Sequence, residues 1–163
     1  MKLIQRKSMN SIIPILLEFQ KNYLTPKNLT LSNYQLDPES AEYSGCSFNL
    51  NQDRVHFRCA KITPTKIGQF VTFYKRSNAG PIIPYDLNDS FDTLMVYTKT
   101  TIYQGVFIFP KNILEQKDLI SKEAKGGKRA FRLYPLWDKA ENAQAKKTQE
   151  WQLKYFIPIE QNA

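Results

Sequence analysis

Apolar residues near the start of the chain recur three to four positions apart, which is the spacing of one face of a helix. The residues that carry this pattern are Ile12, Leu16, Phe19 and Tyr23. They predict an amphipathic helix over residues 11–24, with Ser8 or Ser11 as its N-cap. Pro14 is compatible with this helix because it lies in the first turn, where its missing N–H leaves no hydrogen bond unmade.

Two later segments alternate between apolar and polar residues and predict paired strands. Residues 46–50 and 55–59 place apolar side chains at every second position, and the turn-forming sequence 51–53 separates them. Successive side chains of a strand point to opposite faces. The two segments therefore predict a β-hairpin with one buried face.

Two near-continuous apolar runs, residues 91–97 and 105–109, predict strands that are covered on both faces and form the centre of the sheet. Residues 69–74 and 130–134 predict two further strands because they contain aromatic and aliphatic residues that favour strands. We expect Phe70, Phe107, Phe109 and Phe131 to lie in the interior.

Helical patterns follow at residues 112–119 and from 140 to about 151. The end of the second helix is left open, because residues 151–159 also alternate with period two. Residues 28–37 show no single pattern. The order of strands and helices predicts one α/β domain over residues 1–163, with a central mixed β-sheet flanked by helices.

The chain is basic, with a formal net charge of +8 and a pI near 9.4. Such a surplus favours polyanionic partners, foremost nucleic acids or anionic membrane surfaces. The apolar run 12–17 is far shorter than the roughly 20 residues of a membrane-spanning helix, so we expect no membrane insertion. With two cysteines, Cys46 and Cys59, the sequence favours reduced thiols and a cytoplasmic location.

The excess of positive charge is concentrated in two segments. Residues 61–76 carry four cationic side chains and no acidic one, and residues 117–132 carry six against two. Hydroxyl groups and glycine in the loop 63–68 and glycines at 126–127 suit close approach to phosphate. The candidate phosphate contacts are Lys61, Thr63, Lys66, Lys75, Arg76, Lys128, Arg129 and Arg132.

Aromatic residues lie close to these cations along the chain. Tyr134, Trp137 and Trp151 are candidates for stacking against bases, which is how single-stranded nucleic acid is held while cations follow its backbone. The alternative is that these rings belong to the core. His56 lies between Cys46 and Cys59, but this spacing matches no usual zinc site, and we expect a partly exposed strand residue instead.

Four ordered segments, residues 60–71, 106–111, 127–135 and 147–152, resemble the MepB family, and the resemblance extends over about residues 43–156. It implies a fold similar to that of the restriction endonuclease and tRNA endonuclease class. The family is named after a gene that accompanies a multidrug efflux pump in staphylococci, and this context implies no defined reaction. A shared fold does not by itself confer an activity.

Nuclease chemistry on such a fold follows the PD-(D/E)xK pattern, in which carboxylates hold Mg²⁺ and a lysine stabilises charge at the phosphate. Asp89 and Asp92, with Asp86, precede the strand at 93–97, and Glu42 is a more distant candidate. Lys111 or Lys61 would serve as the lysine. The second half of the pattern is missing, since residues 105–109 contain no acid. In the alternative reading the aspartates form a solvated turn.

The sequence therefore predicts a nucleic-acid-binding protein, with DNA slightly favoured, on a catalytically degenerate endonuclease-like scaffold that needs no cofactor. One alternative is a Mg²⁺-dependent nuclease that uses Asp92 and neighbouring carboxylates. Another is an efflux-associated protein or small-molecule binder, which predicts an apolar pocket lined by aromatic residues.

Overall fold

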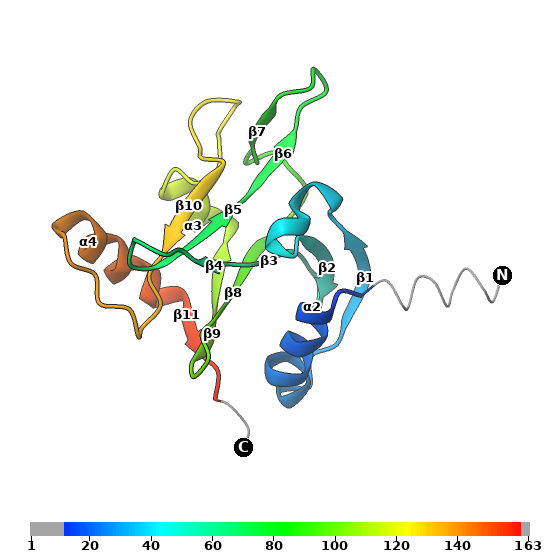
Figure 1. The fold of residues 1–163 in the computed structure, drawn as a ribbon. Coiled ribbons are helices and arrows are strands. Elements are labelled where there is room, and N and C mark those ends of the chain that lie inside the picture. The colour runs from blue at the N-terminus through cyan, green and yellow to red at the C-terminus, as the bar shows by residue number, and fades with distance from the viewer. Residues whose placement is uncertain (1–11, 161–163) are drawn as a thin grey trace.

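A six-stranded mixed sheet forms the centre of the computed structural model, which describes residues 12–160 (Figure 1). The strands lie in the order β1 (Leu31–Leu36), β2 (Cys46–Leu50), β3 (Asp53–Cys59), β8 (Thr93–Lys99), β9 (Gln104–Pro110) and β11 (Phe156–Pro158). Strands β3 and β8 pair in parallel, and the other neighbouring strands pair in antiparallel fashion. The predicted central mixed sheet is confirmed.

The predicted hairpin is present, because β2 and β3 pair with Cys46 opposite Phe57 and Leu50 opposite Asp53. Strands β8 and β9 are interior strands of the sheet, each with a neighbour on both sides, and are almost completely buried. Both faces of the sheet are covered at these strands, which explains why their sequences are almost continuously apolar.

Helices lie on both faces of the sheet (Figure 1). On one face Phe19 packs against Phe57 and Tyr97, with ring centroids 5.1 Å from each. On the other face Phe107 and Phe109 contact a second cluster that includes Leu114. The sheet therefore separates two hydrophobic cores.

The first helical segment consists of α2 (Pro14–Phe19), a π-helical turn η1 (Gln20–Leu24) and a 3-10 turn η2 (Thr25–Lys27). Pro14 occupies the first turn, as predicted, and the segment ends at Asn28 in the left-handed conformation. The two predicted caps, Ser8 and Ser11, lie outside the described residues.

A second, smaller sheet joins β10 (Ala130–Leu133), β5 (Gln69–Thr72) and β4 (Lys61–Ile62), while β6 (Tyr74–Arg76) pairs with β7 (Ile82–Pro84). The predicted strand 69–74 is divided at Phe73, whose N–H donates to the carbonyl of Arg129. The remaining elements are η3 (Pro38–Tyr43), α3 (Lys111–Gln116), α4 (Ala143–Gln152) and η4 (Leu153–Tyr155).

Strand β1 falls in the segment for which the sequence showed no single pattern. The ambiguity after residue 151 is also resolved, since α4 ends at Gln152 and β11 begins at Phe156. Within residues 12–160, none of the helices is both long enough and apolar enough to cross a membrane.

Candidate functional site

A cavity of about 630 Å³ opens between α4, the loop from β4 to β5 and the segment that precedes β10. Four cationic side chains line it: Lys66 comes from the first basic segment, and Lys117, Lys128 and Arg132 come from the second. Tyr134 and Trp151 are aromatic members of the same lining. We call this cavity the basic groove. It brings the two basic segments of the sequence together.

Helix α4 forms one wall of the basic groove and is anchored by two glutamines. Gln152 is buried; its Nε2 donates to the carbonyl of Arg132 (3.0 Å), and its Oε1 accepts from the N–H of Tyr134 (2.9 Å). One amide side chain thus pairs with the free edge of β10 as a strand would. Gln149 Nε2 donates to the carbonyl of Asp138 (2.7 Å), and Asn142 caps the start of the helix.

The loop from β4 to β5 forms the opposite wall and lies tightly against β10. Gly68 has a φ of +92°, and a Cβ at this position would lie 2.7 Å from the carbonyl oxygen of Leu133 and 2.9 Å from the Tyr134 ring. A side chain is therefore excluded both by backbone conformation and by space. Arg132 Nη1 donates to Thr63 Oγ1 at 2.9 Å and fixes the loop from the other side.

The third wall is the chain that runs from α3 to β10. Asp118 Oδ1 accepts the N–H of Gly127 at 2.9 Å, which folds this segment back on itself immediately before Lys128. Lys117 Nζ lies 5.1 Å from the centroid of the Trp151 ring, a cation–π contact across the groove lining.

The positive charge of the basic groove is poorly compensated. Among residues 12–160 no carboxylate lies within ion-pair distance of Lys66 or Lys128, and both side chains are exposed. Glu141 is the acidic residue of the groove lining. The groove therefore carries an excess of positive charge that is available to a polyanion.

Other predicted phosphate contacts lie elsewhere and form ion pairs. Lys61 pairs with Glu42 (3.4 Å), Lys75 with Asp89 (2.7 Å) and Arg76 with Glu39 (2.7 Å). Arg129 is exposed, next to the groove residue Lys128 in sequence. Sequence reasoning left out Lys117, although its position at the start of the second basic segment was a usable signal.

The predicted aromatic residues divide in a similar way. Tyr134 and Trp151 line the basic groove, whereas Trp137 stacks on Tyr103 in a separate cavity. The other predictions concerned the interior: Phe107, Phe109 and Phe131 are buried, as expected. The expectation for Phe70 was wrong, because this ring is half-buried at the surface, with the Arg132 guanidinium 5.8 Å from its centroid.

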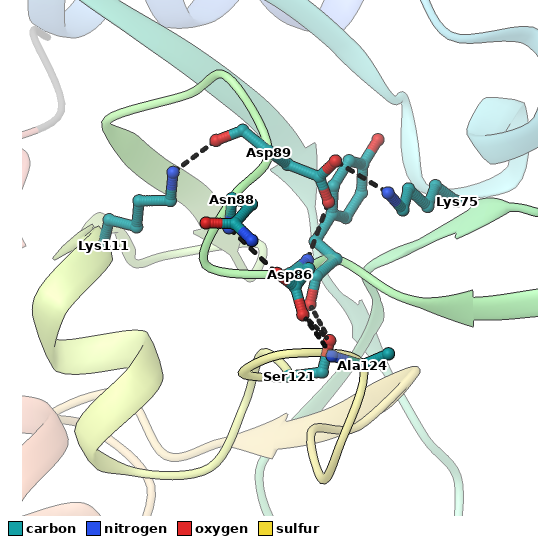
Figure 2. Close-up of polar contacts among 8 residues, drawn as sticks. Lys75, Asp86, Asn88, Asp89, Lys111, Ser121 and Ala124 are labelled. Atoms are coloured by element: carbon teal, nitrogen blue, oxygen red, sulfur yellow. Dashed lines mark hydrogen bonds and ion pairs between the residues drawn. The ribbon is translucent and has the colours of Figure 1, made fainter.

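Two of the predicted nuclease carboxylates, Asp86 and Asp89, have structural partners in a loop cluster before β8 (Figure 2). Asp86 accepts hydrogen bonds from Ser121 Oγ and from the N–H groups of Asn88 and Ala124, and these bonds lower its pKa to about 2. Asp89 pairs with Lys75 through Oδ1 and accepts the N–H of Asp86 through Oδ2.

Lys111 does lie beside these residues, because its Nζ donates to the carbonyl of Asp89. Asp92 accepts the N–H of Arg54 at 2.7 Å and so fixes the start of β3. Glu42 is paired with Lys61 instead. Within the part of the chain that the structure describes, no three His, Cys, Asp or Glu residues gather in a way that could hold a metal ion. The aspartates thus serve to hold loops together.

A second polar cavity, of about 290 Å³, lies beside His56, and we call it the His56 cavity. His56 keeps partial exposure, as predicted, but its ring packs against Phe73, Tyr85 and Phe91. Burial and the positive charge of Arg58 lower the pKa of His56 to about 3, so its imidazole is neutral. Arg58, two residues along the same strand face, is fully buried and pairs with Asp37 at 3.0 Å.

Both cysteines are free thiols, as predicted. Burial raises the pKa of Cys46 to about 12 and that of Cys59 to about 11. Because the thiolate is the reactive form, neither side chain is poised for nucleophilic chemistry.

Comparison with known proteins identifies relatives of this chain. A family model described as MepB-like matches residues 37–158, close to the range of the sequence resemblance. Among solved structures, one titled "Crystal Structure of MepB" superposes with a TM-score of 0.80 at 27% identity, covering 92% of this chain and 99% of the other. The search of curated proteins gives no match.

Proposed function

Because this chain belongs to the MepB-like family, whose description names no reaction, we propose from its own geometry that it is a nucleic-acid-binding protein. The observation that carries the proposal is the convergence of both basic segments on one groove. Lys66 and Lys128 lie far apart in sequence, yet both line this groove and both lack a carboxylate partner among residues 12–160.

The basic groove offers two kinds of contact to a nucleic acid. Lys66, Lys128 and Arg132 are placed to neutralise phosphates, with release of the counterions that surround the polyanion. Tyr134 and Trp151 offer ring surface to bases that are not held in a duplex. The proposal includes DNA as the slightly favoured partner, a cytoplasmic location, and a scaffold related to the endonuclease class.

We do not extend the proposal to hydrolysis. The three aspartates that would begin a PD-(D/E)xK site accept hydrogen bonds from the protein backbone, and Asp89 is also bound to Lys75. Releasing them for a cation would break the contacts that close these loops. Binding without cleavage is the function that this arrangement supports best.

A specific observation supports the small-molecule alternative at a different place. An apolar cavity of about 610 Å³ is lined by the exposed side chains of Ile102 and Leu136, with Glu160 as its acidic member. Tyr103 and Trp137 stack at its side, 5.4 Å apart and 13° from parallel. Stacked rings and a carboxylate suit a planar aromatic cation. Thermal stabilisation by ethidium that is lost in Trp137→Ala would support this second candidate.

The test of the main proposal is fluorescence anisotropy of labelled oligonucleotides. Single- and double-stranded DNA and RNA of one sequence are titrated with the wild type, with Lys66→Glu and with Lys128→Glu. Each reversal is expected to weaken binding about tenfold, or ~1.4 kcal/mol. Lys21→Glu, an exposed lysine on η1 outside the groove, is the matched control and is expected to bind as the wild type does.

Two results would overturn the proposal. One is the absence of binding at low salt, and the other is equal binding by the groove variants and the control. The same mixtures, incubated with Mg²⁺ and with a chelator and then run on a gel, separate binding from cleavage. Products that form only with Mg²⁺ and disappear in Asp92→Ala would establish the nuclease alternative instead.

A further inference from the structure

The chain runs from the basic groove through β5 to β6, and β6 forms part of the wall of the His56 cavity. Its walls are the segment around Asp37, the strand β6 with Tyr74 and Lys75, and the side chains of His56 and Tyr85. Its volume of about 290 Å³ is at the lower end of the roughly 300–1,000 Å³ range of small-molecule sites. This size suits one small ligand and excludes a large one.

Three cations around the His56 cavity are paired with carboxylates. Lys75 binds Asp89 at 2.7 Å, Arg76 binds Glu39 at 2.7 Å, and the buried Arg58 binds Asp37 at 3.0 Å. Three cations thus face three carboxylates. Arg54 has no carboxylate partner among residues 12–160, but its guanidinium already donates to Gln35 Oε1 and Ser47 Oγ of the lining. A neutral ligand therefore fits this cavity better than an anion.

Hydrogen-bonding groups in this region are nevertheless left without partners. Among the described residues five buried side-chain atoms lack a hydrogen bond, and three of them are His56 Nδ1, Arg58 Nε and Ser40 Oγ. Ser40 and Arg58 are close neighbours, because a Cβ built on Gly45 would lie 2.4 Å from Ser40 Cβ and 3.2 Å from Arg58 Cζ. Buried polar groups are normally satisfied, and of these three residues only His56 lines the cavity, so its ring is the group that a ligand there can partner.

Aromatic rings hold the polar groups in place. Tyr85 stacks on Phe73 with centroids 4.3 Å apart and 22° between the planes, and His56 lies 4.7 Å from the Tyr85 ring. The Arg58 guanidinium lies 5.3 Å from the centroid of Phe73. Because the imidazole is neutral, it offers one hydrogen-bond donor and one acceptor. Such a rigid, neutral and aromatic site matches a flat heterocycle.

We propose that the His56 cavity binds a single nucleobase, held by aromatic contact and by hydrogen bonds to His56. The inference rests on the proposed function, because a nucleic acid in the basic groove supplies the base. From Ile67 in the groove lining to Tyr74 in the cavity wall the chain advances seven residues, at most about 23 Å of extended strand. A stacked strand advances ~3.4 Å per nucleotide, so about seven nucleotides span that length when they are stacked, and fewer span it when the strand is extended.

The test uses free nucleosides, which lack the phosphates that the basic groove requires. His56 is the sole histidine of the chain, so its imidazole ¹⁵N signals report on this cavity alone. Adenosine, guanosine, cytidine and uridine are titrated at millimolar concentrations, and inorganic phosphate is titrated separately. We expect at least one nucleoside, and not phosphate, to shift the His56 signals saturably.

Two variants and one control locate the binding. Tyr74→Ala and Tyr85→Ala remove ring surface from the cavity and are expected to weaken nucleoside binding at least tenfold. Circular dichroism shows whether each variant is folded. Both rings are partly exposed, and Tyr74 is the safer of the two because Tyr85 also stacks on the buried Phe73. Lys21→Ala, an exposed lysine on η1 that lines neither cavity, is expected to leave nucleoside binding unchanged.

The outcomes distinguish this inference from the proposed function. If no nucleoside shifts His56, or if phosphate shifts it equally, the base site is wrong, whatever the oligonucleotides do. If a nucleoside binds but Lys66→Glu and Lys128→Glu do not weaken oligonucleotide binding, the groove proposal fails and the cavity remains as a nucleoside site. If both bind as expected, an oligonucleotide of about eight residues should bind more tightly than one of four.

Discussion

Arg132 donates a hydrogen bond of 2.9 Å from Nη1 to Thr63 Oγ1, and this contact joins the two basic segments of the chain across 69 positions of sequence. The guanidinium also donates to the carbonyl of Ile67 and lies over the Phe70 ring. Arg132 is thus oriented by three neighbours while it lines the basic groove. A cation held in this way loses little additional entropy when it binds a phosphate.

The first prediction concerns this contact. Thr63→Val keeps the shape of the side chain and removes its hydroxyl, so Arg132 loses one fixed partner. We expect a loss of about 0.5–1.5 kcal/mol in the free energy of unfolding, together with weaker oligonucleotide binding. Urea denaturation and anisotropy measure the two effects. Thr101→Val, an exposed threonine between β8 and β9 that lies outside the groove lining, serves as the control. Equal behaviour of the two variants would show that the contact has no role.

The second prediction concerns the buried ion pair. In Asp37→Ala the fully buried Arg58 keeps its charge without a partner, and we expect a cost of about 3–5 kcal/mol. In the double variant Asp37→Ala with Arg58→Met no buried charge remains, so much of the loss should be recovered. Urea denaturation of the single and double variants forms a complete cycle. A double variant less stable than Asp37→Ala would contradict this reading of the pair.

The third prediction is a pH dependence that comes from His56. In the unfolded chain the His56 imidazole becomes protonated below its usual pKa of 6.5. In the folded protein its pKa is about 3, so it becomes protonated only near that pH. Between these values the unfolded state binds more protons, so the free energy of unfolding falls by about 1.4 kcal/mol per unit as the pH is lowered. Above pH 6.5 His56 contributes no slope.

Urea denaturation at pH 7 and pH 5 measures this effect, with His56→Phe as the reference protein. Phenylalanine keeps a ring among Phe73, Tyr85 and Phe91 but does not titrate. The wild type is expected to lose about 2 kcal/mol more than the variant between the two pH values. The carboxylates are common to both proteins, so their contribution cancels. The same loss in both proteins would mean that His56 is not neutral and buried.

Sequence patterns predicted the strands whose burial gives a regular pattern of apolar residues. Strands β8 and β9 were recognisable because both of their faces are buried. Strand β1 was not, since it lies at the sheet edge with Ser32, Asn33 and Gln35 exposed, and it therefore has no apolar face to mark it. Such an edge strand is defined by its pairing with β2 more than by its own residues.

The functional features depended on contacts that the sequence does not display. The two basic segments were visible, but their convergence depends on Gln152 and Gly68, which bring α4 and the loop after β4 against β10. Arg58 was overlooked because the alternation of β3 assigned its face to solvent. A second layer of structure covers that face, and a charge can be buried there because Asp37 pairs with it.

The most direct test of the account is the salt dependence of oligonucleotide binding by the wild type and by the double variant Lys66→Ala with Lys128→Ala. Each phosphate contact contributes roughly 0.7–0.9 to the slope of log affinity against log salt. The groove variant should therefore have a slope smaller by about 1.5, whereas Lys21→Ala with Lys154→Ala, two exposed lysines outside the groove lining, should keep the wild-type slope. Equal slopes for all three proteins would contradict the assignment of the basic groove.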